Sequence, residues 1–258
     1  MLLAEVPAFE LWNDTLFKEA AIQPVAFITG GTSGIGLETA VQLLAAGWRV
    51  AVCGRDATRV GEAERTLRGN ADRDDVMALS CDVADRHEGQ AIIEGVLAVW
   101  GRVDAFVHSA GLAPRLPLSQ HDDELISKVF ETNTLSALRL VRGLWPGFER
   151  QRGGTVVLVS SMASREPYPG FFAYAASKAA LNLAAVSIAQ EGAACGVRAF
   201  AVAPGAVETP MLRAIADEAM VPRNKALSPS AVALVIVQCI LGVHDAYNGQ
   251  TIFIPSPV

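Results

Sequence analysis

Seven short apolar runs alternate along the chain with longer segments of helical period. The runs are rich in Val, Ile and Phe, and they are expected to form strands near residues 25–29, 48–53, 75–80, 104–108, 154–159, 197–202 and 250–254. Strands of this composition that alternate with helices predict a parallel sheet with helices on both faces. The sequence therefore predicts a doubly wound α/β fold of about seven strands.

The length and composition fit one well-buried domain. The chain has 258 residues, of which 51% are hydrophobic and 19% are charged, and single α/β domains of this size are common. We expect residues 25–258 to form this domain and residues 1–24 to precede it as an extension. The extension carries Phe9, Trp12 and Phe17, and it is interpreted as an amphipathic arm on this domain or on a neighbouring subunit. A membrane-surface role is the weaker alternative, since the extension contains one Lys and no Arg.

Charge and cysteine use argue against several classes of protein. The formal net charge of −6, with no basic stripe, argues against a nucleic-acid partner. The four cysteines are isolated, without a CxxC pair or a His at zinc-ligand spacing, which predicts reduced thiols in a cytoplasmic protein. The first residues lack the features of a secretory signal, so no export is expected. The longest apolar stretch, residues 231–243, is interrupted by Gln238 and is too short to span a membrane, so it predicts a buried helix.

Four glycines, Gly30, Gly31, Gly34 and Gly36, follow the first predicted strand and precede a helical segment that begins about Ile35. A chain that turns sharply, approaches a phosphate closely and opens a helix needs residues without a Cβ atom. The pyrophosphate of a dinucleotide would then lie at the positive N-terminus of the helix. A glycine-rich turn without a ligand is the alternative that this pattern leaves open.

Tyr174 and Lys178 lie four residues apart in the run YAASK, which is rich in good helix formers. Residues at i and i+4 share one face of a helix, so the two side chains can meet. A fixed ammonium favours the phenolate, and it is expected to lower the pKa of Tyr174 from its usual value of about 10 toward the neutral range. The pair is interpreted as a tuned acid and base. An exposed pair on an ordinary helix is the alternative.

With Thr29 in front, the glycine segment reads TGGTSGIG and resembles the T-G-x-x-x-G-x-G signature of the short-chain dehydrogenase/reductase family. Further matches follow in the family's order, and they are CDVAD, NTLSAL, VVLVSSMAS, YAASK and APGAVETPM. The resemblance covers residues 25 to about 254. It implies a compact Rossmann-like domain that binds a nicotinamide cofactor, transfers a hydride and requires no metal.

The resemblance also implies the catalytic residues. Tyr174 would be the acid and base, and Lys178 would tune it and hold the nicotinamide ribose. Ser161, which stands 13 residues before Tyr174 as in the family, would hydrogen-bond the substrate oxygen where negative charge grows, and Ser160 would be structural. Asn133 would bend its helix and hold a water that links Lys178 to solvent as a proton relay. A Ser-His-Asp hydrolase is set aside, because neither serine lies in a G-x-S-x-G motif and the four histidines show no supporting motif.

The expected cofactor contacts follow the same matches. They are Gly30, Thr32, Ser33, Gly34, Ile35, Gly36, Arg55, Asp82, Val83, Ala110, Gly111, Tyr174, Lys178, Pro204, Gly205, Val207 and Thr209. By resemblance, Asp82 would hold the adenine ring, and Val207 and Thr209 would hold the carboxamide. The second predicted strand ends VCGRD, with Gly54 where NAD-dependent members carry an acid and Arg55 next, which favours NADP(H). The acid that follows Arg55, Asp56, is interpreted as a cap of the next helix.

The chain departs from the family pattern at HSAG, residues 108–111, where relatives read N-N-A-G or N-A-G. His108 and Ser109 must replace asparagine hydrogen bonds, and we expect a tolerated structural variation. The C-terminal GQTIFIPSPV lacks the acidic, glycine-rich ending of many relatives, which leaves the tetramer geometry open. Long helices around 122–146 and 171–194 are where relatives pair, so a homodimer or homotetramer is expected.

Residues 207–228 are expected to close over the substrate as a lid. The apolar side chains of this segment, and the aromatic ones just before Tyr174, are Met211, Leu212, Ile215, Tyr168, Phe171 and Phe172. They either line a pocket for a hydrophobic ketone or alcohol or simply pack the lid. Arg115, Arg165 and Arg213 either meet an anionic group of the substrate or are solvated surface charges.

The sequence therefore predicts an NADP(H)-dependent oxidoreductase that interconverts a carbonyl and a secondary alcohol, with a small to medium apolar substrate of the ketone or 3-oxoacyl type. Two alternatives keep the fold. One is epimerisation or dehydration with a bound cofactor, against which the compact length and the glycine spacing argue. The other is a catalytically silent NADP-binding sensor or scaffold, which is expected where a catalytic residue is missing, yet all four are present.

Overall fold

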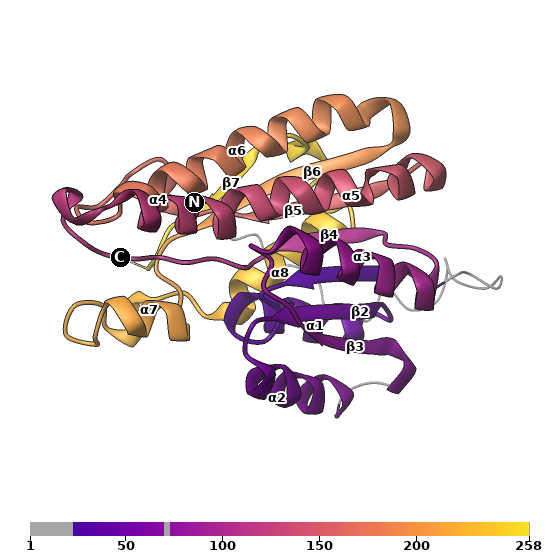
Figure 1. Cartoon of the computed structure of the whole chain (residues 1–258), viewed down its shortest axis with the longest axis horizontal. Coiled ribbons are helices and arrows are strands. Elements are labelled where there is room, and N and C mark those ends of the chain that lie inside the picture. The colour runs from indigo at the N-terminus through magenta and orange to yellow at the C-terminus, as the bar shows by residue number, and fades with distance from the viewer. Residues whose placement is uncertain (1–22, 70–72, 258) are drawn as a thin grey trace.

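The computed structural model describes residues 23–69 and 73–257, and a seven-stranded parallel sheet forms the centre of this part of the chain (Figure 1). The strands are β1 (Val25–Thr29), β2 (Arg49–Gly54), β3 (Val76–Ser80), β4 (Ala105–His108), β5 (Gly154–Val159), β6 (Val197–Pro204) and β7 (Thr251–Ile254). All seven lie where the sequence predicts strands, so the predicted Rossmann-like fold is confirmed. The N-terminal arm, as far as residue 22, lies outside the described residues.

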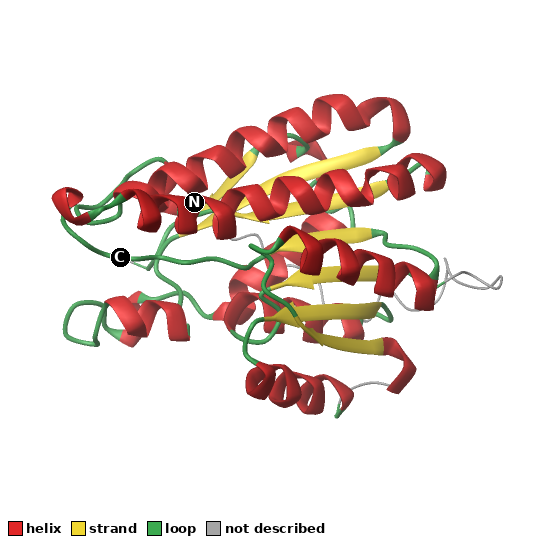
Figure 2. Cartoon of the chain, viewed as in Figure 1, coloured by secondary structure: helices red, strands yellow, loops and turns green. Residues whose placement is uncertain are grey.

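Helices cover both faces of the sheet (Figure 2). They are α1 (Gly34–Ala45), α2 (Ala57–Arg68), α3 (Arg86–Trp100), α4 (Asp123–Phe130), α5 (Ser136–Gln151), α6 (Phe172–Gly192), α7 (Pro210–Ile215) and α8 (Pro229–Ile240). Successive side chains of a strand point to opposite faces. In β1, Val25 and Phe27 therefore join the core formed with α3, α5 and α6, whereas Ala26 and Ile28 join the core formed with α1 and α8. This two-sided burial explains why the strands are apolar throughout.

Two of the apolar helices, α8 and α6, pack in the core. Helix α8, which the sequence predicts to be buried, contributes Val232 and Ile236 to the core, and both are fully buried. The segment 172–195, which contains α6, is the one described helix long and apolar enough to cross a membrane by length and composition. Its Leu181 and Ala185 are fully buried against the sheet. Packing inside this domain therefore explains the buried face of α6.

Acidic side chains cap α2, α3 and α4, whereas the N-terminus of α1 has no side-chain cap. Asp56 accepts hydrogen bonds from the backbone N–H groups of Thr58 and Arg59 at 2.9 and 3.2 Å, so its predicted role as a helix cap is confirmed. Ser33, at the start of α1, makes no such side-chain bond, and the first turn of α1 holds no acidic residue. The N–H groups of that turn are therefore left without a side-chain partner of this kind.

The order of the strands, β3-β2-β1-β4-β5-β6-β7, changes direction at β1. Strand β1 pairs with β2 on one side and with β4 on the other, and Thr29 at its end stands opposite Cys53 and His108. Ligands of open α/β sheets bind beyond the carboxyl ends of the strands at such a point. The fold therefore directs attention to the loops that follow β1, β4, β5 and β6.

Candidate active site

The structure brings the four predicted catalytic side chains to the carboxyl edge of the sheet. Ser161 follows β5, Tyr174 and Lys178 lie near the start of α6, and Asn133 lies in a π turn (Glu131–Leu135) between α4 and α5. Lys178 Nζ is 5.9 Å from the ring centroid of Tyr174, and Ser161 hydrogen-bonds the phenol. A Cβ atom on Gly111 would lie 3.3 Å from Asn133 Oδ1 and 3.5 Å from Lys178 Nζ. All four side chains therefore surround one point.

The pKa of Tyr174 is raised, whereas the sequence leads us to expect a lowered one. Burial of the phenol is the main cause, and the hydrogen bond with Ser161 acts in the opposite direction. The ammonium of Lys178 is held by the carbonyl of Val159, to which Nζ donates at 2.7 Å. The expected direction was wrong because burial of the phenol is the dominant cause, and the influence that opposes it comes from Ser161 and not from the ammonium.

Lys178 is only 4% exposed, and burial lowers the pKa of its side chain to about 8. An amine with this pKa can gain or lose a proton near neutral pH. The backbone carbonyl of Lys178 accepts a hydrogen bond from Ser160 Oγ at 3.0 Å, and the Ser160 N–H donates to Val202 O at 2.7 Å. Ser160 thus ties α6 to the sheet, which is the kind of structural contact expected of it.

Asn133 is fully engaged in hydrogen bonds inside the fold. Its Oδ1 accepts from the Leu112 N–H at 2.7 Å, and its Nδ2 donates to Leu112 O and to Ser177 Oγ, each at 2.9 Å. Ser177 Oγ in turn donates to Tyr174 O at 2.7 Å. The π turn agrees with the expectation that the helix bends locally at Asn133. Its role in a proton relay stays a prediction.

The glycine turn packs tightly against two other loops. Gly30 has φ +65°, and a Cβ atom there would lie 2.7 Å from the backbone nitrogen of Ala110. A Cβ atom on Gly36 would lie 2.4 Å from Gly30 O, and one on Gly34 would lie 2.9 Å from Thr209 Cγ2. The glycines are therefore required by close approach of the protein's own chain, in addition to the approach of a phosphate that the sequence suggested.

The residues around this turn fit a dinucleotide. The uncapped N-terminus of α1 attracts an anion such as a pyrophosphate. Beside it, a Cβ atom on Gly54 would lie 2.7 Å from Thr32 Oγ1, so Thr32 fills the space beside this glycine. The exposed Arg55 makes no ion pair within residues 23–69 and 73–257. Asp82 has one carboxylate oxygen bound to the Ala84 N–H at 3.0 Å.

The other predicted cofactor contacts lie at the same edge of the sheet. Ser33, Ile35, Val83, Pro204, Gly205 and Val207 belong to the ends of β1, β3 and β6 and to the segments that follow them. The hydroxyl of Thr209 donates to Val207 O at 3.1 Å and accepts from the Leu212 N–H at 3.2 Å, so it caps α7. Thr209 therefore has a structural role as a helix cap. The sequence indicated only a contact with the carboxamide of the cofactor.

Helix α7 lies over this edge, in the segment expected to act as a lid. A Cβ atom on Gly111 would lie 3.8 Å from Met211 Cε, so this segment reaches the predicted catalytic side chains. The arginines considered for substrate binding differ in their contacts. Arg213 pairs with Glu208 and Arg165 pairs with the next residue, whereas Arg115 donates to the thioether of Met220 at 2.7 Å.

The burial of His108 was not indicated by the sequence. It is fully buried, and its Nδ1 lies 2.9 Å from Thr29 Oγ1. Burial, assisted by the positive charge of Lys178, lowers the pKa of His108 to about 3. The departure from N-N-A-G at this position was the only signal in the sequence, and it does not reveal that the ring is enclosed.

We expect His108 to make the folded protein sensitive to acid. Its pKa is about 3 in the folded protein and about 6.5 in an unfolded chain, so the unfolded chain binds one more proton between these values. The contribution of His108 to the unfolding free energy is therefore fully present above pH 6.5, and it is lost as the pH falls toward 3. From about pH 7 to about pH 5 this group removes about 2 kcal/mol. Urea unfolding at both pH values measures this loss of unfolding free energy. The loss between the two pH values should be smaller in His108→Asn than in the unaltered protein, by about the same amount. Equal losses in the two proteins would contradict the prediction.

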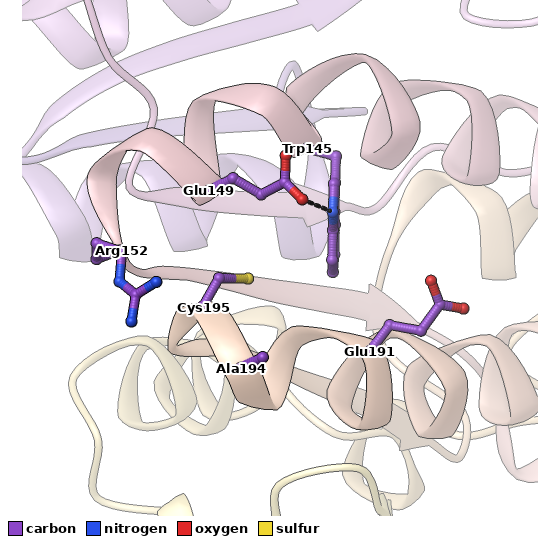
Figure 3. A pocket seen from close by; sticks show the side chains of 6 residues that line it. All are labelled: Trp145, Glu149, Arg152, Glu191, Ala194 and Cys195. Atoms are coloured by element: carbon purple, nitrogen blue, oxygen red, sulfur yellow. Dashed lines mark hydrogen bonds between the residues drawn. The ribbon is translucent and has the colours of Figure 1, made fainter.

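A separate hollow lies away from these residues, at the ends of α5 and α6. Its volume is about 510 Å³, and it is lined by Trp145, Glu149, Arg152, Glu191, Ala194 and Cys195 (Figure 3). Within it, Trp145 Nε1 donates to Glu149 Oε1 at 3.1 Å. Because α5 and α6 end where β5 and β6 are about to begin, this hollow is at the amino edge of the sheet, opposite the catalytic side chains.

Residues 24–219 match the family model described as short chain dehydrogenase. The chain is 33% identical over 248 residues to a benzil reductase ((S)-benzoin forming) of Saccharomyces cerevisiae, covering 88% of this chain and 94% of the relative. It is 29% identical over 242 residues to an acetoacetyl-CoA reductase of Acinetobacter sp., covering 90% of this chain and 96% of that one. The chain belongs to the short-chain dehydrogenase/reductase family.

The fold is shared with a solved structure of a 3-ketoacyl-(acyl-carrier-protein) reductase from Brucella melitensis complexed with NADH. The TM-score is 0.83 at 22% identity, and the match covers 90% of this chain and 97% of the other. Membership of the family makes the protein an oxidoreductase that acts on CH–OH groups and binds a nicotinamide cofactor.

Proposed function

We propose that this protein is an NADP(H)-dependent ketoreductase that interconverts a carbonyl and a secondary alcohol on a small to medium apolar substrate. The observation that supports this most directly is the meeting of Ser161, Tyr174 and Lys178 beside the glycine turn. Gly30, Gly34, Gly36 and the N-terminus of α1 would hold the cofactor's pyrophosphate, and the bound cofactor supplies or accepts the hydride.

In this proposal the hydroxyls of Ser161 and Tyr174 both donate hydrogen bonds to the substrate oxygen. Negative charge grows on that oxygen during reduction, so donors fixed in position lower the barrier. Tyr174 gives up its phenolic proton to complete the alcohol. The raised pKa of the buried phenol keeps it protonated and ready to donate.

Lys178 has two parts in the proposal. Its Nζ, now held by Val159 O at 2.7 Å, would hold the nicotinamide ribose. With a pKa of about 8, it would also return a proton to Tyr174 near neutral pH. Asn133 fixes the π turn beside this pair and would hold the water that links Lys178 to solvent.

An apolar substrate of the ketone or 3-oxoacyl type is supported by the surroundings of Tyr174 and by the relatives. The ring of Phe171 lies 5.6 Å from that of Tyr174, and Tyr168 and Phe172 are exposed nearby. Two relatives are named as a benzil reductase and an acetoacetyl-CoA reductase, and both names describe reduction of a ketone.

We further propose that the protein is a homodimer or homotetramer in the cytoplasm. The four free thiols support the cytoplasmic location.

The preference for NADP(H) is tested by binding. Arg55 is exposed and free of an ion pair in the described part of the chain, so it can meet a 2′-phosphate. Gly54 supplies no acid for a 2′-hydroxyl, and Thr32 Oγ1 fills the adjacent space. We expect fluorescence titration to give NADPH a dissociation constant at least about tenfold below that of NADH.

The variant Arg55→Gln should lose about tenfold in affinity for NADPH and leave NADH binding unchanged. Arg150→Gln, at the far end of α5, is the matched control and should change neither value. Equal affinities in the unaltered protein would overturn the NADP(H) preference. Tight binding of NADPH without turnover of any ketone in a broad panel would favour a silent sensor over a ketoreductase.

A further inference from the structure

The turn that carries Ser161 is joined to α6 by a chain of two side-chain hydrogen bonds. Asn182 Nδ2 donates to Ser164 Oγ at 2.8 Å, and Ser164 Oγ donates to Ser161 O at 2.6 Å. The Ser164 N–H donates to the same carbonyl at 3.0 Å. Ser164 ends the short 3₁₀ turn after β5, and Asn182 lies in α6. The chain therefore links the backbone of Ser161 to the helix that carries Tyr174.

The direction of both hydrogen bonds follows from the groups that take part. A carbonyl oxygen only accepts, so the one hydroxyl proton of Ser164 goes to Ser161 O. Ser164 Oγ is then an acceptor toward Asn182, and only the amide nitrogen of Asn182 can donate to it. The amide oxygen, Oδ1, is left buried without a hydrogen-bond partner among the described residues. A buried acceptor without a partner costs stability, so the amide is explained by the bond that its nitrogen donates and not by its oxygen.

Asn182 lies on the face of α6 that carries Tyr174 and Lys178. It follows Lys178 by four residues, as Lys178 follows Tyr174, and residues at this spacing share one face of a helix. On the other side of Ser161, the hydroxyl of Ser160 donates to Lys178 O at 3.0 Å. The chain is therefore tied to α6 both before and after Ser161, which limits how far the Ser161 hydroxyl can move relative to Tyr174.

The hydroxyl of Ser161 keeps its own proton available. Its Oγ accepts from the Ala163 N–H at 3.2 Å, so this bond leaves the hydroxyl proton for another partner. In the proposed mechanism that partner is the substrate oxygen, and a donor lowers the barrier where it is fixed in position. A misplacement of about 1 Å can cost about a hundredfold in rate. The position of this turn is therefore expected to affect the rate directly.

We propose that Asn182 is a positioning residue, which acts through Ser164 to hold the hydroxyl of Ser161 where it meets the substrate oxygen. The inference rests on the proposed ketoreductase function, because that function gives Ser161 its contact with substrate. The four catalytic residues expected from the sequence include neither Asn182 nor Ser164. The inference therefore extends the site by two side chains that touch neither substrate nor cofactor.

Two substitutions break the chain at different places. Ser164→Ala removes the hydroxyl that joins the two residues, and Asn182→Leu removes the donor but keeps a side chain of similar shape. We expect each variant to lower kcat about tenfold, with KM and the NADPH dissociation constant changed less than about twofold. Because both substitutions break the same chain, the double variant should lose no more kcat than either single variant.

Two further variants serve as a rescue and a control. Ser164→Thr keeps the hydroxyl and should recover most of kcat. Ser187→Ala, on the exposed surface of α6 beyond Asn182, makes the same change as Ser164→Ala at a distance from the turn. It should behave as the unaltered protein.

Hydrogen exchange, measured by mass spectrometry, gives a readout that does not depend on activity. The Ser164 amide donates to Ser161 O, so its protection reports whether the turn is closed. The amides of residues 161–166 should exchange at least about fivefold faster in Asn182→Leu and Ser164→Ala than in the unaltered protein or Ser187→Ala. Asn182→Leu should unfold at the same urea concentration as the unaltered protein or at a higher one, because it also removes the unpartnered Oδ1.

Several results would overturn the proposal. They are full kcat in Ser164→Ala or Asn182→Leu, losses of kcat that multiply in the double variant, and unchanged exchange in residues 161–166. A much lower urea midpoint in Asn182→Leu would also overturn it, because the amide would then serve the fold itself. Failure of the unaltered protein to reduce any ketone would instead remove the proposed function, and the exchange of residues 161–166 would still decide whether Asn182 holds the turn.

Discussion

The Tyr174→Phe protein is expected to bind NADPH as the unaltered protein does and to lose about a thousandfold or more in kcat. The substitution removes one hydroxyl and keeps the ring, which packs 5.6 Å from Phe171. General acid catalysis by a positioned side chain contributes about a hundredfold to ten-thousandfold. In the proposed mechanism the phenol also shares the contact with the substrate oxygen with Ser161, so both contributions would be lost together. Steady-state kinetics on a ketone that the unaltered protein reduces would measure the change.

Tyr247→Phe is the matched control for this prediction. Tyr247 is 50% exposed and lies just before β7, at the amino edge of the sheet and away from the proposed chemistry. Its loss of the same hydroxyl should leave kcat within about twofold of the original value. A Tyr174→Phe protein that turned over as fast as Tyr247→Phe would remove Tyr174 from the mechanism. A loss of NADPH binding in Tyr174→Phe larger than one hydroxyl contact explains would show a structural effect instead.

The strands and several local features could be predicted from the sequence because their causes lie in neighbouring residues. Each strand is a short apolar run buried on both faces, and that burial is visible in composition. Asp56 could be assigned as a cap because capping depends on the two or three residues that follow it. The spacing of Tyr174 and Lys178 gave their shared helix face for the same reason.

The features that the sequence did not give depend on contacts between distant segments. The pKa of Tyr174 is set by how deeply α6 and its neighbours enclose the phenol, and this burial is not visible in the YAASK motif. Gly30 and Ala110 are 80 residues apart in the chain, yet their backbones meet in the folded protein. His108 and Lys178 are likewise 70 residues apart in the chain, yet the ammonium of Lys178 acts on the buried ring of His108.

Gly36→Ala is expected to have the second largest effect, on both stability and cofactor binding. The added Cβ atom would lie 2.4 Å from Gly30 O and 2.9 Å from Gly30 C, which are backbone atoms that cannot rotate away. Overpacking of this kind costs about 1–3 kcal/mol of unfolding free energy. The turn must open to relieve it, and Gly30, with φ +65°, then leaves its place against Ala110.

The displaced turn no longer presents its backbone to the pyrophosphate, so NADPH affinity should fall about a hundredfold or more. Gly61→Ala is the matched control, because Gly61 lies inside α2 with nothing within 4 Å of an added Cβ atom. Alanine is the better helix former there, so Gly61→Ala should stabilise the protein by about 0.5–1 kcal/mol and leave NADPH binding unchanged. Urea unfolding and fluorescence titration of the two variants measure both quantities. If Gly36→Ala matched Gly61→Ala in both, the close approach at Gly36 would not be what holds the cofactor turn in shape.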